Sequence, residues 1–203
     1  MTVAKASDRV ALYGGSFDPP HNGHLATVAL LLNSRVVDRV IIVPSGERPD
    51  KKKATATADR LAMIRIAVAE AFPNDARVSV SDVHAMGTVG YGTINVLDYM
   101  RTKESQAEFL VTIGSELVSD LPKWRESSRL AASASFLVVE RPGSAMPETP
   151  YGFRLERVPN GDRSGILVSS TQLREMVCSG ESCAGFVPAA VAAFISQRSL
   201  YLK

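Results

Sequence analysis

The sequence predicts an α/β protein built on a doubly wound parallel sheet, with helices on both faces. Short apolar segments rich in Val, Ile and Leu alternate with helical patterns along the 203 residues. Several of these segments are apolar on both faces, as expected for parallel strands that helices cover. A double glycine follows the first segment, at the kind of turn where such sheets bind ligands. This alternating order also favours right-handed crossover connections between the strands.

The predicted elements follow one another in a regular order. The predicted strands cover residues 10–13, 39–43, 78–80, 108–113 and 134–139, with a further candidate at 165–168. The predicted helices cover residues 25–33, 58–71, 94–102, 123–132 and 188–197. Residues 44–57 and 141–151 are expected to form loops. Strands and helices in this alternation indicate a Rossmann-like fold.

We expect residues 1–203 to form a single domain, with a C-terminal helical segment over about residues 171–203 packed on it. A chain of this length is large enough for one well-packed α/β core and small for two. The composition is 45% hydrophobic and 22% charged, with a net charge of +2, which is typical of a globular protein. Cys178 and Cys183 are too few for a disulfide framework, so both are expected to be free thiols.

The chain shows no feature of a membrane or nucleic-acid binding protein. The N-terminal residues lack the apolar core of a signal peptide, and no stretch approaches eighteen apolar residues. Acidic and basic residues are interspersed, so the charge gives no argument for a nucleic-acid surface. We therefore expect a cytoplasmic protein without nucleic-acid or membrane partners; a homo-oligomer is compatible with the sequence.

One segment is especially informative about function. Residues 14–24 read Gly-Gly-Ser-Phe-Asp-Pro-Pro-His-Asn-Gly-His, and they hold His21 and His24, two of the three histidines of the chain. The segment lies between the first predicted strand and a helical pattern, where unsatisfied helix amides favour anions. Gly14 and Gly15 allow close backbone approach. Because neither G-x-G-x-x-G nor a Walker A sequence is present, we predict a phosphate site of another kind.

This segment resembles the H-x-G-H motif of the nucleotidylyl transferase superfamily, whose members transfer a nucleotidyl group from a nucleoside triphosphate. The wider sequence is similar to nicotinate/nicotinamide mononucleotide adenylyltransferases, and Ile113-Gly114-x-Glu116 followed by Trp124 indicates that family. The resemblance implies transfer of AMP from ATP to a pyridine mononucleotide in NAD biosynthesis, with pyrophosphate as the second product. Nicotinate mononucleotide is favoured as the acceptor, and nicotinamide mononucleotide is the alternative.

The resemblance also implies three groups of site residues and a metal. The catalytic residues, which would contact the ATP phosphates, are His21, His24 and Arg174. Further ATP-binding residues are Gly14, Gly15, Ser16, Phe17, Gly114, Glu116, Ser170 and Thr171. Mononucleotide-binding residues are Lys51, Thr93 and Trp124. Mg²⁺ is expected to enter with ATP and to be held by phosphates and water, without a metal site in the protein.

The predicted chemistry agrees with the residues that the sequence lacks. In adenylyl transfer the attacking group is an ionised phosphate, so no base is needed to deprotonate it. Catalysis then depends on bringing two anions together in line and stabilising the charge that develops on the phosphates. Neither G-x-S-x-G nor H-E-x-x-H is found in the chain.

Two other functions remain open at the level of sequence. The same fold could use another phosphorylated acceptor, as pantetheine-phosphate adenylyltransferases and cytidylyltransferases do. A catalytically inactive nucleotide sensor is the second alternative, favoured by Asp50, Asn95 and Glu116, which stand where the family usually has His, a carboxylate and Asp. The presence of His24 and Arg174 favours an enzyme, because a sensor needs no transition-state donors.

Each motif also has an interpretation without a functional role. Trp124 could be a core residue, and the run Lys51-Lys52-Lys53 could be a solvated charge cluster. Ser170 to Arg174 could form an ordinary capped helix. His84, isolated after a short predicted strand, is expected to be a structural or surface histidine.

Overall fold

A parallel six-stranded sheet forms the centre of the computed structural model, which describes residues 7–46, 55–140, 147–159 and 168–202. Every neighbouring pair of strands is parallel, in the order β3-β2-β1-β4-β5-β6. The strands are β1 (Arg9–Gly15), β2 (Arg39–Pro44), β3 (Val78–Val80), β4 (Glu108–Gly114), β5 (Ser135–Val139) and β6 (Arg154–Arg157). The helices are α1 (Asn22–Asn33), α2 (Thr57–Ala71), α3 (Thr93–Lys103), the 3₁₀ helix η1 (Ser115–Lys123), α4 (Ser127–Ser133), α5 (Ser170–Cys178) and α6 (Ala189–Gln197). The predicted Rossmann-like, doubly wound fold is therefore confirmed.

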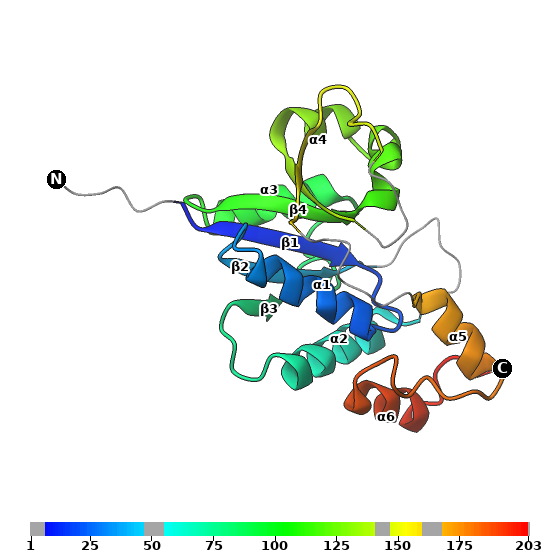
Figure 1. Ribbon diagram of the computed structural model, residues 1–203. Coiled ribbons are helices and arrows are strands. Elements are labelled where there is room, and N and C mark those ends of the chain that lie inside the picture. The colour runs from blue at the N-terminus through cyan, green and yellow to red at the C-terminus, as the bar shows by residue number, and fades with distance from the viewer. Residues whose placement is uncertain (1–6, 47–54, 141–146, 160–167, 203) are drawn as a thin grey trace.

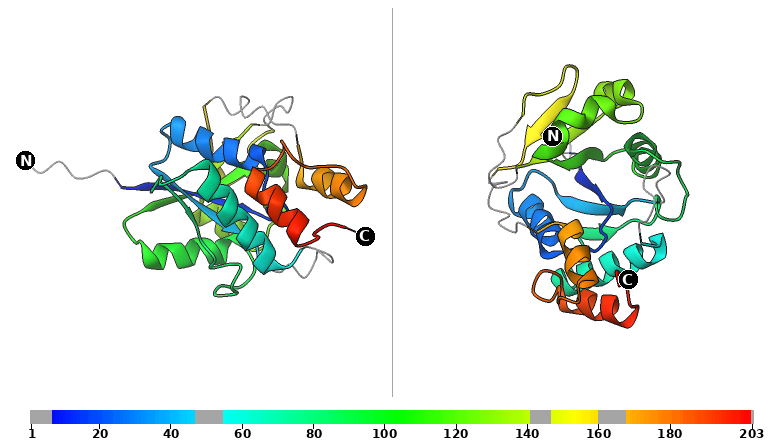
Figure 2. Two further views of the ribbon diagram at one scale, coloured as in Figure 1. Left: turned by 90° about the horizontal axis from the view of Figure 1, so that it is seen from below. Right: turned by 90° about the vertical axis from the view of Figure 1, so that its right-hand side faces the viewer.

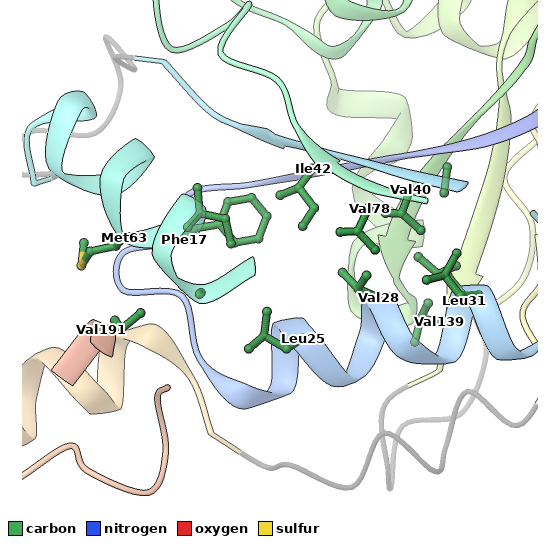
Figure 3. Packing of buried hydrophobic residues seen from close by; sticks show 14 of the residues in the cluster. Phe17, Leu25, Val28, Leu31, Val40, Ile42, Met63, Val78, Val139 and Val191 are labelled. Carbon is green, nitrogen blue, oxygen red and sulfur yellow. The ribbon is translucent and has the colours of Figure 1, made fainter. Parts of the chain in front are cut away.

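Helices cover both faces of the sheet (Figure 1). One hydrophobic cluster joins the sheet to α1, α2, α5 and α6, and a second joins it to α3, η1 and α4. Figure 2 shows α5 and α6 beside α1 and α2, at one end of the molecule. In the first cluster, side chains of α1, β2, α2 and α6 gather with Phe17, which is 1% exposed (Figure 3). No helix within the described residues is long and apolar enough to cross a membrane.

The strand order places the predicted motif at a special point of the sheet. The chain runs outward from β1 to β2 and β3, then returns to the other side of β1 as β4. The carboxyl ends of β1 and β4 therefore flank the point where the strand order reverses, which is where doubly wound sheets bind ligands. Gly15 ends β1 and Gly114 ends β4.

Two parts of the structure differ from the sequence predictions, and a third prediction lies mostly outside the described residues. The sixth strand is Arg154–Arg157, which was not predicted because its residues are mostly charged and form no apolar run. Of the strand predicted over residues 165–168, the first three residues lie outside the described residues, and Val168 belongs to no strand. The helix predicted over 123–132 is wrong at its start: Ser115–Lys123, with Pro122 inside, forms a 3₁₀ helix, and α4 begins only at Ser127.

Arg60 on α2 is the largest fully buried side chain of the described residues, at 1% exposed. Its guanidinium donates to the carbonyls of Ser16 (3.0 Å) and Ser45 (2.7 Å), which follow β1 and β2. It also donates to the carbonyls of Thr55 (3.0 Å) and Gly46 (3.4 Å). Burying a charge is costly unless its donors are satisfied. One side chain thus links the loops after two strands to the start of α2.

Replacing Arg60 with Met should strongly destabilise the protein, because four carbonyls that are buried or partly buried lose a donor. We expect the free energy of unfolding to fall by about 3 kcal/mol or more. Urea-induced unfolding of the two proteins measures this difference. Arg65→Met on the same helix is the matched control, since Arg65 is half exposed and pairs with Asp82 at 2.9 Å. The control should cost less than about 1 kcal/mol; equal losses for both variants would contradict the linking role of Arg60.

Candidate active site

The loop after β1 requires glycine at position 15, because a side chain there would collide with the ring of Phe17. A Cβ atom added at Gly15 would lie 2.9 Å from Cζ of Phe17. Phe17 has a left-handed backbone, with φ of 50°, and its ring is buried beneath the loop. Phe17 is predicted to bind ATP, and only its backbone is placed to do so, because its ring packs in the core.

His21 and His24 form a stacked pair at the start of α1. His21 is the N-cap residue, and the two ring centroids are 3.7 Å apart with planes inclined by 25°. The edge of Phe17 supports His24 from another side, at 4.9 Å between centroids. The backbone N–H of His21 donates to Nδ1 of His24 at 3.1 Å. A neutral His24 therefore carries its ring proton on Nε2, where it can donate to an anion.

The backbone amides of α1 contribute less to anion binding than the sequence suggested. The N–H of Asn22 donates to the carbonyl of Phe186 at 2.9 Å, and the N–H of His24 donates to the carbonyl of His21 at 2.9 Å. The side-chain amide of Asn22 also donates to the carbonyl of Gly185. Since the segment before α6 occupies part of this helix N-terminus, an anion here would depend more on the imidazole side chains.

The second predicted phosphate motif, on α5, lies directly against the first. Ser169 caps α5 by accepting a hydrogen bond from the Gln172 N–H (3.2 Å), and Gln172 Oε1 accepts from the Ser169 N–H (2.9 Å). The hydroxyl of Ser170 donates to the carbonyl of Pro19 at 2.9 Å. Two segments about 150 positions apart in sequence are therefore joined by direct contact.

Arg174 completes this junction from the same helix. Its guanidinium donates to the carbonyl of Asp18 at 2.7 Å and to the hydroxyl of Thr171 at 3.1 Å. Two contacts leave a guanidinium with further N–H groups that can meet phosphate oxygens, because it carries five. Arg174 is thus anchored on the loop that also carries His21 and His24, the other two residues predicted to be catalytic.

At the end of β4, Glu116 folds back over Gly114. A Cβ atom added at Gly114 would lie 2.6 Å from Oε1 of Glu116 and in contact with Oε2. The glycine therefore makes room for the carboxylate beside the strand end. Gly114 and Glu116 are two of the residues predicted to bind ATP.

Two of the three residues predicted to bind the mononucleotide, Thr93 and Trp124, lie across the sheet from α5. Trp124 follows η1 and is half-buried, its ring edge-on to Phe136 at 6.2 Å between centroids. Thr93 is the first residue of α3 and follows Gly92, whose φ is +124°. A Cβ atom at Gly92 would lie 3.4 Å from Cδ of Arg125, so the loops of Thr93 and Trp124 are adjacent. The third predicted residue, Lys51, lies outside the described residues, as do Asp50 and the rest of the lysine run.

Two structural residues of the site carried no signal in the sequence analysis. Asp18 lies in the first loop and is 5% exposed, and its carboxylate accepts a hydrogen bond from the hydroxyl of Tyr201 at 2.8 Å. Burial, and then the charge of Asp18, raise the pKa of Tyr201 far above its usual value, so this hydroxyl stays protonated. Such a contact depends on tertiary structure alone, so no local pattern could have revealed it.

Comparison with known proteins agrees with this geometry. Residues 12–176 match the family model described as cytidylyltransferase-like. A protein of Opitutus terrae is 35% identical over 199 residues, which cover 95% of this chain and 97% of the relative. A protein of Corynebacterium kroppenstedtii is 30% identical over 204 residues, covering 100% and 95%. Both relatives are named "Probable nicotinate-nucleotide adenylyltransferase".

The chain belongs to the nicotinate-nucleotide adenylyltransferase family. Among solved structures, it is similar to the Plasmodium falciparum nicotinic acid mononucleotide adenylyltransferase complexed with NaAD, with a TM-score of 0.80. That match covers 96% of this chain and 97% of the other at 20% identity, so it supports the fold alone. The curated relatives confirm the predicted family.

Within the nicotinate-nucleotide adenylyltransferase family, the structure gives Asn95 a clear local role. Its side-chain amide donates to the carbonyls of Gly90 and Tyr91, both at 3.1 Å. These bonds fix the loop that leads to Thr93. A carboxylate at this position could not donate them, so the substitution noted in the sequence is accommodated by a loop built around the amide.

Gly114→Ala should raise the KM for ATP with little loss of stability. The added methyl displaces only the flexible end of Glu116, and Gly114 has φ of −76°, which any residue tolerates. We expect the free energy of unfolding to change by less than about 1 kcal/mol. Steady-state kinetics and urea unfolding measure the two effects.

Gly46→Ala is the contrasting variant for that experiment. A Cβ atom there would meet the backbone carbonyl of His84, which cannot move aside as a side chain does. This variant should lose about 1–3 kcal/mol of stability. For Gly114→Ala itself, an unchanged KM for ATP would show that Glu116 does not take part in ATP binding.

Proposed function

We propose that this protein transfers the adenylyl group of ATP to nicotinate mononucleotide, giving nicotinate adenine dinucleotide and pyrophosphate. The observation that carries the proposal is the full-length similarity, at 30–35% identity, to relatives named for this activity. The contact between the two phosphate-type motifs at the carboxyl ends of the strands supports it. It follows that the protein takes part in NAD biosynthesis.

The reaction needs positioning more than proton transfer. A phosphate oxygen of the mononucleotide attacks the α-phosphorus of ATP, and the bond from that phosphorus to the bridging oxygen breaks. Pyrophosphate leaves with the electron pair, so no proton has to be removed from the nucleophile. The barrier is then lowered by holding two anions in line and by donors aimed at the developing charge.

His24 and Arg174 are the donors that we assign to this task. The Nε2–H of His24 is set as a donor because Nδ1 accepts the His21 amide. The guanidinium of Arg174 is anchored on the carbonyl of Asp18, in the same loop. Both groups are thus held by the loop after β1, which makes them suited to act on one phosphate chain. His21 supports His24 through the stacked ring.

The nucleoside and pyridine parts of the substrates would bind at the other end of the site. We assign the ribose of ATP to Glu116 beside Gly114, since a carboxylate accepts hydrogen bonds from hydroxyls. We assign the pyridine ring to Trp124, whose half-buried indole offers an aromatic surface for a planar ring. Thr93 lies on the neighbouring loop, at the start of α3.

The residues of this site are compatible with Mg²⁺ that binds together with ATP. In the described part of the chain, no group of three His, Cys, Asp or Glu side chains is placed to hold a metal ion. The donors around the first loop are imidazole and guanidinium groups, which suit phosphate better than a hard cation. The ion's ligands would thus be phosphate oxygens and water, and its chemistry would be to neutralise phosphate charge.

His24→Ala should lower kcat by roughly 10²–10³, the scale for removing one transition-state donor. Binding of ATP should change less, because the lost interaction strengthens as charge develops. Pyrophosphate release with Mg-ATP and nicotinate mononucleotide measures kcat. His84→Ala is the matched control, since His84 lies outside the first loop and faces Tyr91 at 6.2 Å. A loss below about tenfold would refute the assigned role of His24.

Trp124→Ala should raise the KM for nicotinate mononucleotide by about tenfold, the scale of one lost aromatic stack. The KM for ATP should stay unchanged. Phe153→Leu is the control, because Phe153 packs against Phe136 at 5.8 Å and lies outside the proposed pocket. It should lower stability without affecting either KM. An unchanged KM in Trp124→Ala would place the indole in the core alone.

The acceptor is tested by comparing nicotinate mononucleotide, nicotinamide mononucleotide and phosphopantetheine in the same assay. The highest kcat/KM is expected for nicotinate mononucleotide. A higher value for phosphopantetheine would assign the protein to another reaction of the same fold. ATP binding without turnover of any acceptor would favour a nucleotide sensor.

A further inference from the structure

The carboxylate of Asp18 joins two segments that are distant in the sequence. Asp18 is 5% exposed, in the loop between β1 and α1. Its Oδ1 accepts the hydroxyl of Tyr201 at 2.8 Å, and its Oδ2 accepts the backbone N–H of Thr55 at 3.3 Å. Tyr201 follows α6, and Thr55 precedes α2. One side chain thus ties both segments to the loop that carries His21 and His24.

The backbone of the same residue holds Arg174. The carbonyl of Asp18 accepts the Arg174 guanidinium at 2.7 Å, while the next carbonyl, that of Pro19, accepts the hydroxyl of Ser170 at 2.9 Å. Any rotation of the loop at Asp18 would therefore move the anchor of Arg174 together with the carboxylate. The position of Arg174 thus depends on the same residue that Tyr201 fixes.

Backbone conformation shows that this contact is constrained from both sides. Phe17, which precedes Asp18, has φ of 50°, and Tyr201 itself has φ of 66°. Left-handed backbones are unfavourable for residues with a side chain, and they persist where the surroundings fix them. Ser199 also has a left-handed backbone and turns the chain after α6. The turn after α6 and the first loop therefore meet in unfavourable conformations that the Asp18–Tyr201 hydrogen bond helps to hold.

We propose that Tyr201 is a positioning residue for adenylyl transfer. Its hydroxyl holds the first loop through Asp18, so that Arg174 and His24 can donate to the same phosphate chain. The inference rests on the proposed function. Tyr201 itself is not assigned a contact with substrate. Its effect is on the alignment of donors in the transition state, where small displacements are costly.

Tyr201→Phe tests the proposal, because it removes one hydroxyl and leaves the ring in place. We expect kcat to fall by about tenfold or more, within the range for misplaced catalytic groups, while the KM for ATP changes by less than about threefold. A merely structural hydroxyl would lower the melting temperature without this split between kcat and KM. Tyr99→Phe is the matched control; Tyr99 lies on α3, beside Lys103, and should leave kcat unchanged.

A double-mutant cycle with Asp18→Ala tests the route of the effect, because alanine removes both oxygens that accept from Tyr201 and Thr55. If Tyr201 acts through Asp18, the double variant Asp18→Ala/Tyr201→Phe should have the same kcat as Asp18→Ala alone. Full additivity of the two losses would overturn the proposal. So would a Tyr201→Phe enzyme with kcat within about twofold of wild type. Should Tyr201→Phe not fold, Asp18→Ala decides alone, since it breaks the link from the loop side and should lower kcat about tenfold or more.

Assays of the wild-type enzyme distinguish a failure of the proposed function from a failure of the positioning role of Tyr201. If it releases no pyrophosphate with ATP and any of the three acceptors, the proposed function fails before any variant is compared. If it turns over and Tyr201→Phe matches it, only the positioning role fails. Circular dichroism melts of each variant establish that the compared proteins are folded.

Discussion

The buried guanidinium of Arg60 is the interaction on which the geometry of the site depends. A charge inside a protein is tolerated only when its N–H groups are satisfied, and here loop carbonyls satisfy them. Two of these carbonyls, of Ser16 and Ser45, come directly after neighbouring parallel strands. The loops at the carboxyl ends of β1 and β2 are therefore fixed relative to each other by a group that cannot give up its charge. A glycine-rich loop would otherwise lose conformational entropy whenever a ligand ordered it.

A rigid loop explains how a site with so few reactive groups can catalyse a reaction. The tautomer of His24 is set by a backbone amide, and the position of the arginine of α5 is set by a backbone carbonyl. In phosphoryl transfer of this kind, donors that are already in place avoid the cost of reorganising at the moment of reaction. The fold supplies that order through contacts between backbone and side chain.

The sequence predicted the architecture and the position of the first loop well, because both follow local rules. Alternating apolar strands and helices determine the fold class, and the Gly14 to His24 segment combines glycine, helix N-terminus and histidine in one stretch. The edge strand β6 was missed since Arg154, Glu156 and Arg157 give it no apolar pattern. The roles of Arg60, Asp18 and Tyr201 could not be predicted, because their partners are loop carbonyls, a carboxylate and a hydroxyl that only the tertiary fold brings near.

The arrangement of the sheet has a consequence for how the protein behaves among other chains. Its two outermost strands are its shortest, with three residues in β3 and four in β6. An edge strand exposes unpaired backbone groups that can recruit a strand from another molecule, and short or charged edges limit this. In β6, Arg154 and Arg157 are exposed, and Arg157 lies 3.5 Å from Glu140. The sheet thus ends on both sides in strands that offer little template for aggregation, while its long central strands stay covered by helices.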